Sequence, residues 1–108
     1  MKTVQLTKEN FEDEVLLSNK PVFVDFYATW CGPCKMMGVT MERIAERSDG
    51  TYKVCKLDVE EAPEIANRYK IRGVPIVLLF RRGVPANAAI GLTAEEDILN
   101  LLWENKAV

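Results

Sequence analysis

Apolar segments with the character of strands alternate along the chain with segments whose apolar residues recur at the helical period. The predicted strands are residues 4–6, 21–27, 52–58, 75–80 and 88–90. The predicted helices are residues 8–17, 33–47, 62–69 and from 93 to about 105. The resulting order, β-α-β-α-β-α-β-β-α, predicts an α/β fold in which helices flank a mixed central β-sheet on both faces.

Two of the predicted helices carry capping signals at their starts. Thr7 precedes the first helix and has a hydroxyl that can accept a bond from an unpaired backbone N–H group. Thr93-x-x-Glu96 has the spacing of a capping box, in which the two side chains bond reciprocally to the backbone. Each signal therefore predicts where one helix begins.

The predicted strands differ in how deeply they should lie in the sheet. Residues 21–27 are apolar on both faces except at Asp25, which indicates a central strand. Cys55 lies within the third strand and is expected to be a small buried apolar residue. Pro85 cannot donate to a neighbouring strand, so the last strand should lie at an edge of the sheet.

Composition and charge narrow the classes of function. The 108 residues are expected to form a single domain over residues 1–108, because 48% are apolar and 28% charged, which is typical of a globular protein. A net charge of −2 argues against nucleic acid or an anionic membrane surface as a partner. The absence of histidine excludes histidine bases and histidine-containing metal sites, and we expect no metal.

The distribution of apolar residues also predicts a location. The longest apolar run, residues 74–80, is far shorter than the ~20 residues that span a bilayer, so no membrane anchor is expected. Charged residues return at Lys8, which leaves no room for the apolar core of a secretory signal. We therefore expect a cytoplasmic protein, and in that compartment a close cysteine pair is more often chemical than structural.

Two cysteines lie between the central strand and the long second helix, in Trp30-Cys31-Gly32-Pro33-Cys34. Cys31 should lie at the helix N-terminus, where unpaired N–H groups and the helix dipole stabilise a thiolate. Gly32 allows a tight turn, and Pro33 has the backbone angle of a first helical turn. A redox-active pair is the leading interpretation, and a zinc half-site or two inert core cysteines are the alternatives.

Several stretches of the chain resemble the thioredoxin family. They are residues 22–35, which contain the Trp-Cys-Gly-Pro-Cys motif, 56–58, 71–75, and 82–83 together with Gly91. The resemblance covers nearly the whole chain. It implies a thioredoxin fold and a thiol–disulfide oxidoreductase that reduces protein disulfides.

The resemblance also implies a role for each residue that matches the family's reactive centre. Cys31 would attack the client disulfide, and Cys34 would then resolve the mixed disulfide. Asp25 would accept the proton of Cys34, and the alternative is an acid that is only hydrogen-bonded within the sheet. Lys56 would modulate that acid, or it is an ordinary strand lysine.

A client-binding surface is implied as well. The backbone of Val74, which precedes a proline that is cis in the family, would pair with the client chain. The residues expected to form this surface are Trp30, Gly32, Pro33, Gly73, Val74, Pro75, Gly91 and Leu92. No bound cofactor is implied, because the cysteine pair itself carries the electrons. The implied partners are disulfide-containing client proteins and a thioredoxin reductase, with the chain itself a monomer.

Three single positions depart from the family pattern, as does the connection between the last two strands at residues 85–87. Val39 stands where a proline usually kinks the long helix, so we expect a straighter helix or a mild bend at Gly38. Tyr27 replaces a frequent tryptophan, and Ile76 replaces a frequent threonine after the cis-proline. None of these positions touches the two sulfurs, so the departures leave open only the choice of partner and the redox potential. An oxidase or isomerase with the same cysteines is an alternative within the same chemistry. A non-catalytic interaction module is the alternative from another class.

Overall fold

A five-stranded mixed sheet forms the centre of the computed structural model, which describes residues 1–104. Its strands are β1 (Val4–Gln5), β2 (Val22–Tyr27), β3 (Lys53–Asp58), β4 (Ile76–Arg81) and β5 (Val84–Ile90). They lie in the order β1-β3-β2-β4-β5, with β1, β3 and β2 parallel and β4 antiparallel to both β2 and β5. The predictions of a central second strand and an edge position for the last strand are confirmed.

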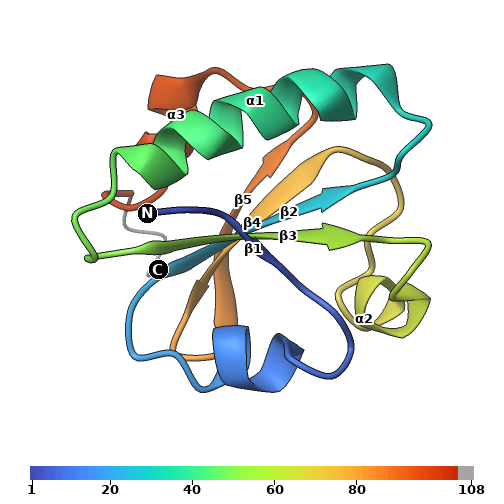
Figure 1. The fold of residues 1–108 in the computed structure, drawn as a ribbon, viewed down its shortest axis with the longest axis horizontal. Coiled ribbons are helices and arrows are strands. Elements are labelled where there is room, and N and C mark those ends of the chain that lie inside the picture. The colour runs from blue at the N-terminus through green and yellow to red at the C-terminus, as the bar shows by residue number, and fades with distance from the viewer. Residues whose placement is uncertain (105–108) are drawn as a thin grey trace.

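Helices cover both faces of this sheet, as the sequence predicts. They are the π-helical turn η1 (Glu12–Leu16) and the α-helices α1 (Gly32–Glu46), α2 (Pro63–Arg68) and α3 (Glu95–Asn100). Figure 1 shows α1 and α3 on one face, with η1 and α2 on the other. Among the described residues, no helix is long and apolar enough to cross a membrane.

The two faces of the sheet bury separate apolar cores because side chains alternate along a strand. Phe23 of β2 packs with residues of α1 and α3 such as Met37 and Ile98. Phe26 of the same strand packs on the opposite face with a cluster that includes Phe11. The central strand therefore contributes to both cores, which explains its nearly continuous apolar sequence.

The first predicted helix is shorter than expected. The Thr7 hydroxyl accepts a hydrogen bond from the Asn10 N–H at 3.1 Å, and the Asn10 side chain accepts one from the Thr7 N–H at 2.7 Å. Thr7 and Asn10 thus bond reciprocally as in a capping box, but they precede the helical turn, and the N-cap of η1 itself is Phe11, which makes no side-chain bond. Helical bonding then widens to the π pattern, in which the Leu17 N–H donates to the Glu12 carbonyl at 2.9 Å.

The capping box predicted for the last helix is wrong. The N-cap of α3 is Ala94, which has no side-chain oxygen to cap the helix. The Thr93 hydroxyl donates instead to the Gly91 carbonyl at 2.9 Å, because a local turn competes for it. Glu96 pairs with Arg47 at 3.1 Å, and α3 ends at Asn100. The predicted continuation of this helix over residues 101–104 is therefore wrong, and residue 105 lies outside the described residues.

The last strand, β5, is longer than predicted and contains a bulge. Leu79 of β4 pairs with Asn87, whereas Phe80 pairs with Pro85, so Ala86 is extra in the ladder. The first half of β5 contains a proline and small exposed residues. It therefore lacks the alternation of apolar and polar residues that predicts a strand. A bulge and a proline also disfavour further strand pairing along this edge.

Candidate active site

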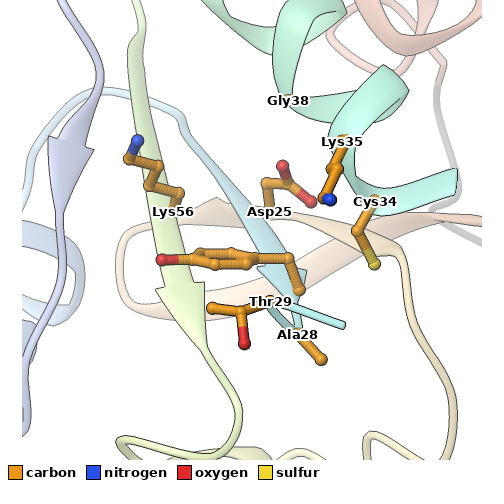
Figure 2. Close-up of a pocket in the computed structure, with 8 residues that line it drawn as sticks. Asp25, Ala28, Thr29, Cys34, Lys35, Gly38 and Lys56 are labelled. Carbon is orange, nitrogen blue, oxygen red and sulfur yellow. The ribbon is translucent and has the colours of Figure 1, made fainter. Parts of the chain in front are cut away.

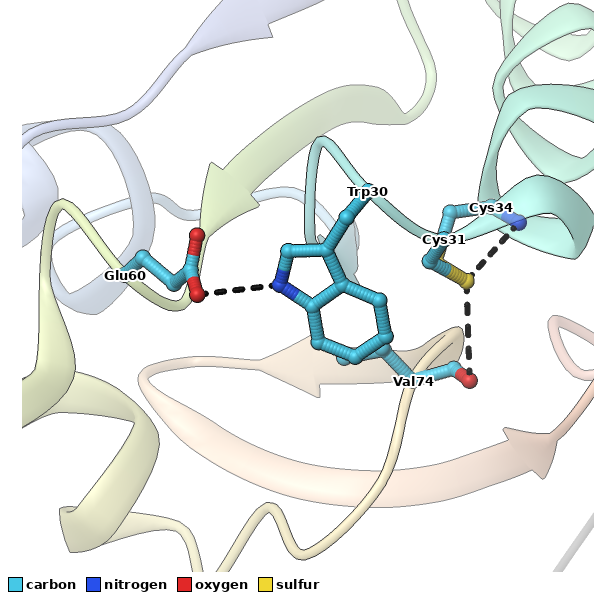
Figure 3. The surroundings of a disulfide bond; sticks show 5 residues. All are labelled: Trp30, Cys31, Cys34, Glu60 and Val74. Carbon is cyan, nitrogen blue, oxygen red and sulfur yellow. Dashed lines mark hydrogen bonds between the residues drawn. A yellow bond between two sulfur atoms is a disulfide. The ribbon is translucent and has the colours of Figure 1, made fainter.

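The cysteine pair lies where β2 leads into α1. Cys31 is the N-cap of α1 in extended conformation, with φ −91° and ψ 114°, and Pro33 occupies the first turn. Cys31 and Cys34 form a disulfide with a Cα–Cα distance of 5.2 Å. The Cys34 N–H donates to the Cys31 sulfur at 3.2 Å (Figure 3), so an unpaired helix donor reaches the atom expected to become a thiolate.

The remaining cysteine is separate from this pair. Cys55 is fully buried in β3, as predicted, and burial raises the pKa of its thiol to about 12. It is therefore almost entirely protonated at neutral pH and a poor nucleophile. Within residues 1–104, no three side chains of His, Cys, Asp or Glu are grouped so that they could hold a metal ion.

The loop before β4 faces the disulfide. The Val74–Pro75 peptide bond is cis, as the resemblance implies. The Cys31 sulfur lies 3.9 Å from the Val74 carbonyl oxygen (Figure 3). On its other side, the Pro75 carbonyl accepts a hydrogen bond from the Gly91 N–H at 2.9 Å. Gly91 has a φ of +83°, a conformation that favours glycine, so this residue has a turn role here.

An exposed apolar surface surrounds the buried sulfurs. Trp30 is 70% exposed, and its indole N–H donates to the Glu60 carboxylate at 2.9 Å (Figure 3). Leu92 is also exposed, as are Gly32 and Pro33 in the first turn of α1. A pocket of about 250 Å³ is lined by Trp30, Val59, Ile71, Arg72, Gly73 and Val74. Trp30, Gly73 and Val74 of the predicted client-binding surface thus line one pocket.

Asp25 lies beneath the cysteine pair and is only 2% exposed. A cavity of about 290 Å³ is lined by Asp25, Tyr27, Ala28, Thr29, Cys34, Lys35, Gly38 and Lys56 (Figure 2). The Asp25 Oδ1 atom has no hydrogen-bond partner among the described residues. Burial raises the pKa of Asp25 to about 7, and the positive charge of Lys56 opposes this rise. The acid that sequence reasoning singled out therefore shares a cavity with Cys34.

Lys56 lies beside this acid on the neighbouring strand. It is the register partner of Asp25 in the β2–β3 ladder. Its ammonium nitrogen is 3.9 Å from Glu42 Oε2, and both of these side chains are partly exposed. The structure therefore places Lys56 between a buried acid and a surface acid.

Two charged residues of the site had no signal in the sequence. Glu60, which bonds Trp30, follows β3 in a loop, and Glu42 lies on the exposed side of α1. Surface glutamates are too common for either to be distinguished without coordinates. Helical structure in α1 continues through Gly38 and Val39, so the substitution of the expected proline leaves the helix unbroken.

Comparisons with known proteins agree with this geometry. The thioredoxin family model matches residues 2–104. A thioredoxin of Rickettsia felis is 40% identical over 103 residues, covering 95% of this chain and 96% of the relative. A thioredoxin of Mycobacterium tuberculosis is 41% identical over 100 residues, covering 93% and 86%. A bifunctional thioredoxin reductase/thioredoxin of Mycobacterium leprae is 41% identical over 97 residues, covering 90% of this chain and 21% of that protein. The chain belongs to the thioredoxin family.

Proposed function

We propose that this chain reduces protein disulfides by dithiol–disulfide exchange, with Cys31 as nucleophile and Cys34 as resolving thiol. As a member of its family with a close cysteine pair, the chain is a thiol–disulfide oxidoreductase. The observation that carries the proposal is the Cys31–Cys34 disulfide at the N-terminus of α1, where the Cys34 N–H bonds the Cys31 sulfur. This arrangement stabilises the thiolate that begins the exchange.

The first step is attack on the client. The Cys31 thiolate forms a bond to one sulfur of the client disulfide, and the other client sulfur leaves as a thiolate. The product is a mixed disulfide between Cys31 and the client. The carbonyl of Val74 and the pocket beside Trp30 support this step, because they offer a client strand a backbone acceptor and an apolar contact.

The second step releases the client. Cys34 loses its proton to Asp25 and attacks the Cys31 sulfur, so the client sulfur leaves and the Cys31–Cys34 disulfide forms. A base works best when its pKa lies near the operating pH, and burial brings the pKa of Asp25 to about 7. The shared cavity supports a transfer between Cys34 and Asp25, directly or through water.

The oxidised pair must then be reduced again. We propose that a thioredoxin reductase supplies these electrons, since the Mycobacterium leprae relative is named as a reductase and a thioredoxin in one protein. A reducing compartment such as the cytoplasm is consistent with a donor of this kind.

Trapping of the mixed disulfide tests the order of the two cysteines. A Cys34→Ser variant can attack a disulfide-bonded client but cannot release it, so a one-to-one covalent adduct should accumulate under non-reducing conditions. The matched Cys31→Ser variant should give no adduct and no reduction. Mass spectrometry of the adduct identifies the linked cysteine. An adduct through Cys34 in the Cys31→Ser variant, with none in the Cys34→Ser variant, would show that the assignment is reversed.

A further inference from the structure

Glu42 connects the surface of α1 to the buried acid of the site. It lies about two helical turns after Cys34. Its Oε2 atom accepts a hydrogen bond from the Thr3 hydroxyl at 2.9 Å and lies 3.9 Å from the Lys56 ammonium. Lys56 and Asp25 are register partners and line the same cavity. Lys56 thus approaches Glu42 at the surface and lines the cavity that also contains Asp25.

We propose that Glu42 is a positioning residue that holds the Lys56 ammonium at the outer side of the cavity and thereby weakens the electric field that Lys56 exerts on Asp25. The proposal rests on the proposed function of Asp25 as the base that receives the proton of Cys34. On this proposal, the surface side chains of Glu42 and Lys56 influence how the rate of mixed-disulfide resolution depends on pH.

The sign of the effect follows from the charges. Lys56 favours the ionised form of Asp25 and lowers its pKa against the larger effect of burial. The Glu42 carboxylate offsets part of the lysine charge and restrains the lysine near the surface. A neutral residue at position 42 would leave Lys56 uncompensated and free to approach the cavity. Both changes favour the Asp25 carboxylate, so its titration midpoint should fall.

Other side chains also line the cavity around Asp25 and have to remain unchanged in the test. Tyr27 comes from the same strand, Cys34 and Lys35 come from α1, and all three line the cavity. On the β4 side, the register partner of Asp25 is the apolar Val77. A substitution at Glu42 alters none of these groups, so a shift can be assigned to Glu42 and Lys56.

The size of the effect is limited by solvent. Lys56 and Glu42 retain 38% and 49% of their side-chain exposure, so water screens much of the interaction between their charges. We therefore expect Glu42→Gln to lower the Asp25 midpoint by about 0.3–0.5 pH unit. Glu46→Gln is the matched control, because Glu46 is an exposed acid of the same helix and the substitution removes the same charge.

A carboxyl titration of the disulfide form tests the coupling without any turnover. The Asp25 side-chain carbon is followed by NMR against pH in the parent chain and in Glu42→Gln, Glu46→Gln, Lys56→Met and the Glu42→Gln/Lys56→Met double variant. We expect a downward shift in Glu42→Gln, none in Glu46→Gln and an upward shift in Lys56→Met. In the Lys56→Met background, Glu42→Gln should have little further effect. No shift in Glu42→Gln, or an equal shift in both backgrounds, would overturn the proposal.

A kinetic measurement tests the consequence for exchange. At pH 6, a lower midpoint leaves more Asp25 ionised, so Glu42→Gln should resolve a mixed disulfide about two- to threefold faster than the parent chain. A variant that only loosened the structure would not gain rate. If Asp25→Asn resolves the mixed disulfide at the parent rate, the base role fails and the kinetic consequence fails with it. The carboxyl titration would still decide whether Glu42 acts on Asp25 through Lys56.

Discussion

Asp25, the proposed base, is buried at an energetic cost. The carboxyl is nearly inaccessible to water, and its Oδ1 atom has no hydrogen-bond partner among residues 1–104. Burial disfavours the charged form, which is why its pKa rises to about 7. The same burial means that ionisation of Asp25 at neutral pH weakens the folded state. The burial that suits Asp25 to the proposed role of base therefore also lowers the stability of the folded state.

Stability against pH should reveal this cost. Asp25 has a pKa of 3.8 when unperturbed and about 7 in the folded chain, so between these values the folded state binds more protons than the unfolded state. The contribution of Asp25 to the free energy of unfolding therefore falls as pH rises from 4 to 7, by on the order of 4 kcal/mol. Asp25→Asn cannot ionise, so its stability relative to the parent chain should increase over this window.

Urea denaturation of both chains at pH 4 and pH 8 checks this prediction. Other carboxyl groups titrate in both proteins, so the difference between the two chains isolates Asp25. A stability difference that is the same at both pH values would contradict the raised pKa.

At the level of elements, the β4–β5 turn fits closely against the end of η1. Gly83 has a φ of +80°, and a Cβ atom at this position would lie 2.7 Å from the Leu16 carbonyl oxygen. Backbone atoms cannot move aside as a flexible side chain can. The hairpin turn and the π-helical turn therefore constrain each other through one glycine.

Two alanine substitutions separate the energetic cost of a positive φ from the cost of a steric contact. Gly83→Ala meets both a positive φ and the Leu16 backbone, whereas Gly50→Ala meets a φ of +102° with open space around the new methyl group. We expect Gly50→Ala to destabilise the fold by about 1 kcal/mol. Gly83→Ala should cost about 1–3 kcal/mol more, because it also overpacks the contact. Chemical denaturation of both variants measures the difference. An equal loss of stability in the two variants would show that η1 moves away from the new methyl group at no cost in free energy.

At the level of the whole molecule, separate segments meet at the reactive end of β2. Cys31 follows this strand at the start of α1, and the loop around Val74 precedes β4, which pairs with β2. The turn at Gly91 follows β5 and bonds the Pro75 carbonyl. The strand order brings these distant parts of the chain together, so they form one surface around the Cys31 sulfur.

The sequence predicted those parts of the fold that depend on local patterns. Apolar periodicity indicated the sheet, and the placement of the Cys-x-x-Cys motif indicated the reactive end of α1. The capping box at Thr93 failed because a nearby carbonyl competed for the hydroxyl. The contacts of Glu42 and Glu60 depend on tertiary structure, so no local pattern reveals them. The cis peptide before Pro75 was expected only from the family resemblance.

The most direct test of the central claim is the redox equilibrium of the Cys31–Cys34 pair. The protein is equilibrated with a series of glutathione buffers, and its state is read from the fluorescence of Trp30, which lies next to the pair. Trp103 is also exposed and is replaced in a Trp103→Phe background to isolate the signal. An electron donor to client disulfides should have a midpoint more reducing than that of glutathione. A midpoint well on the oxidising side would contradict the account and identify an oxidase or isomerase.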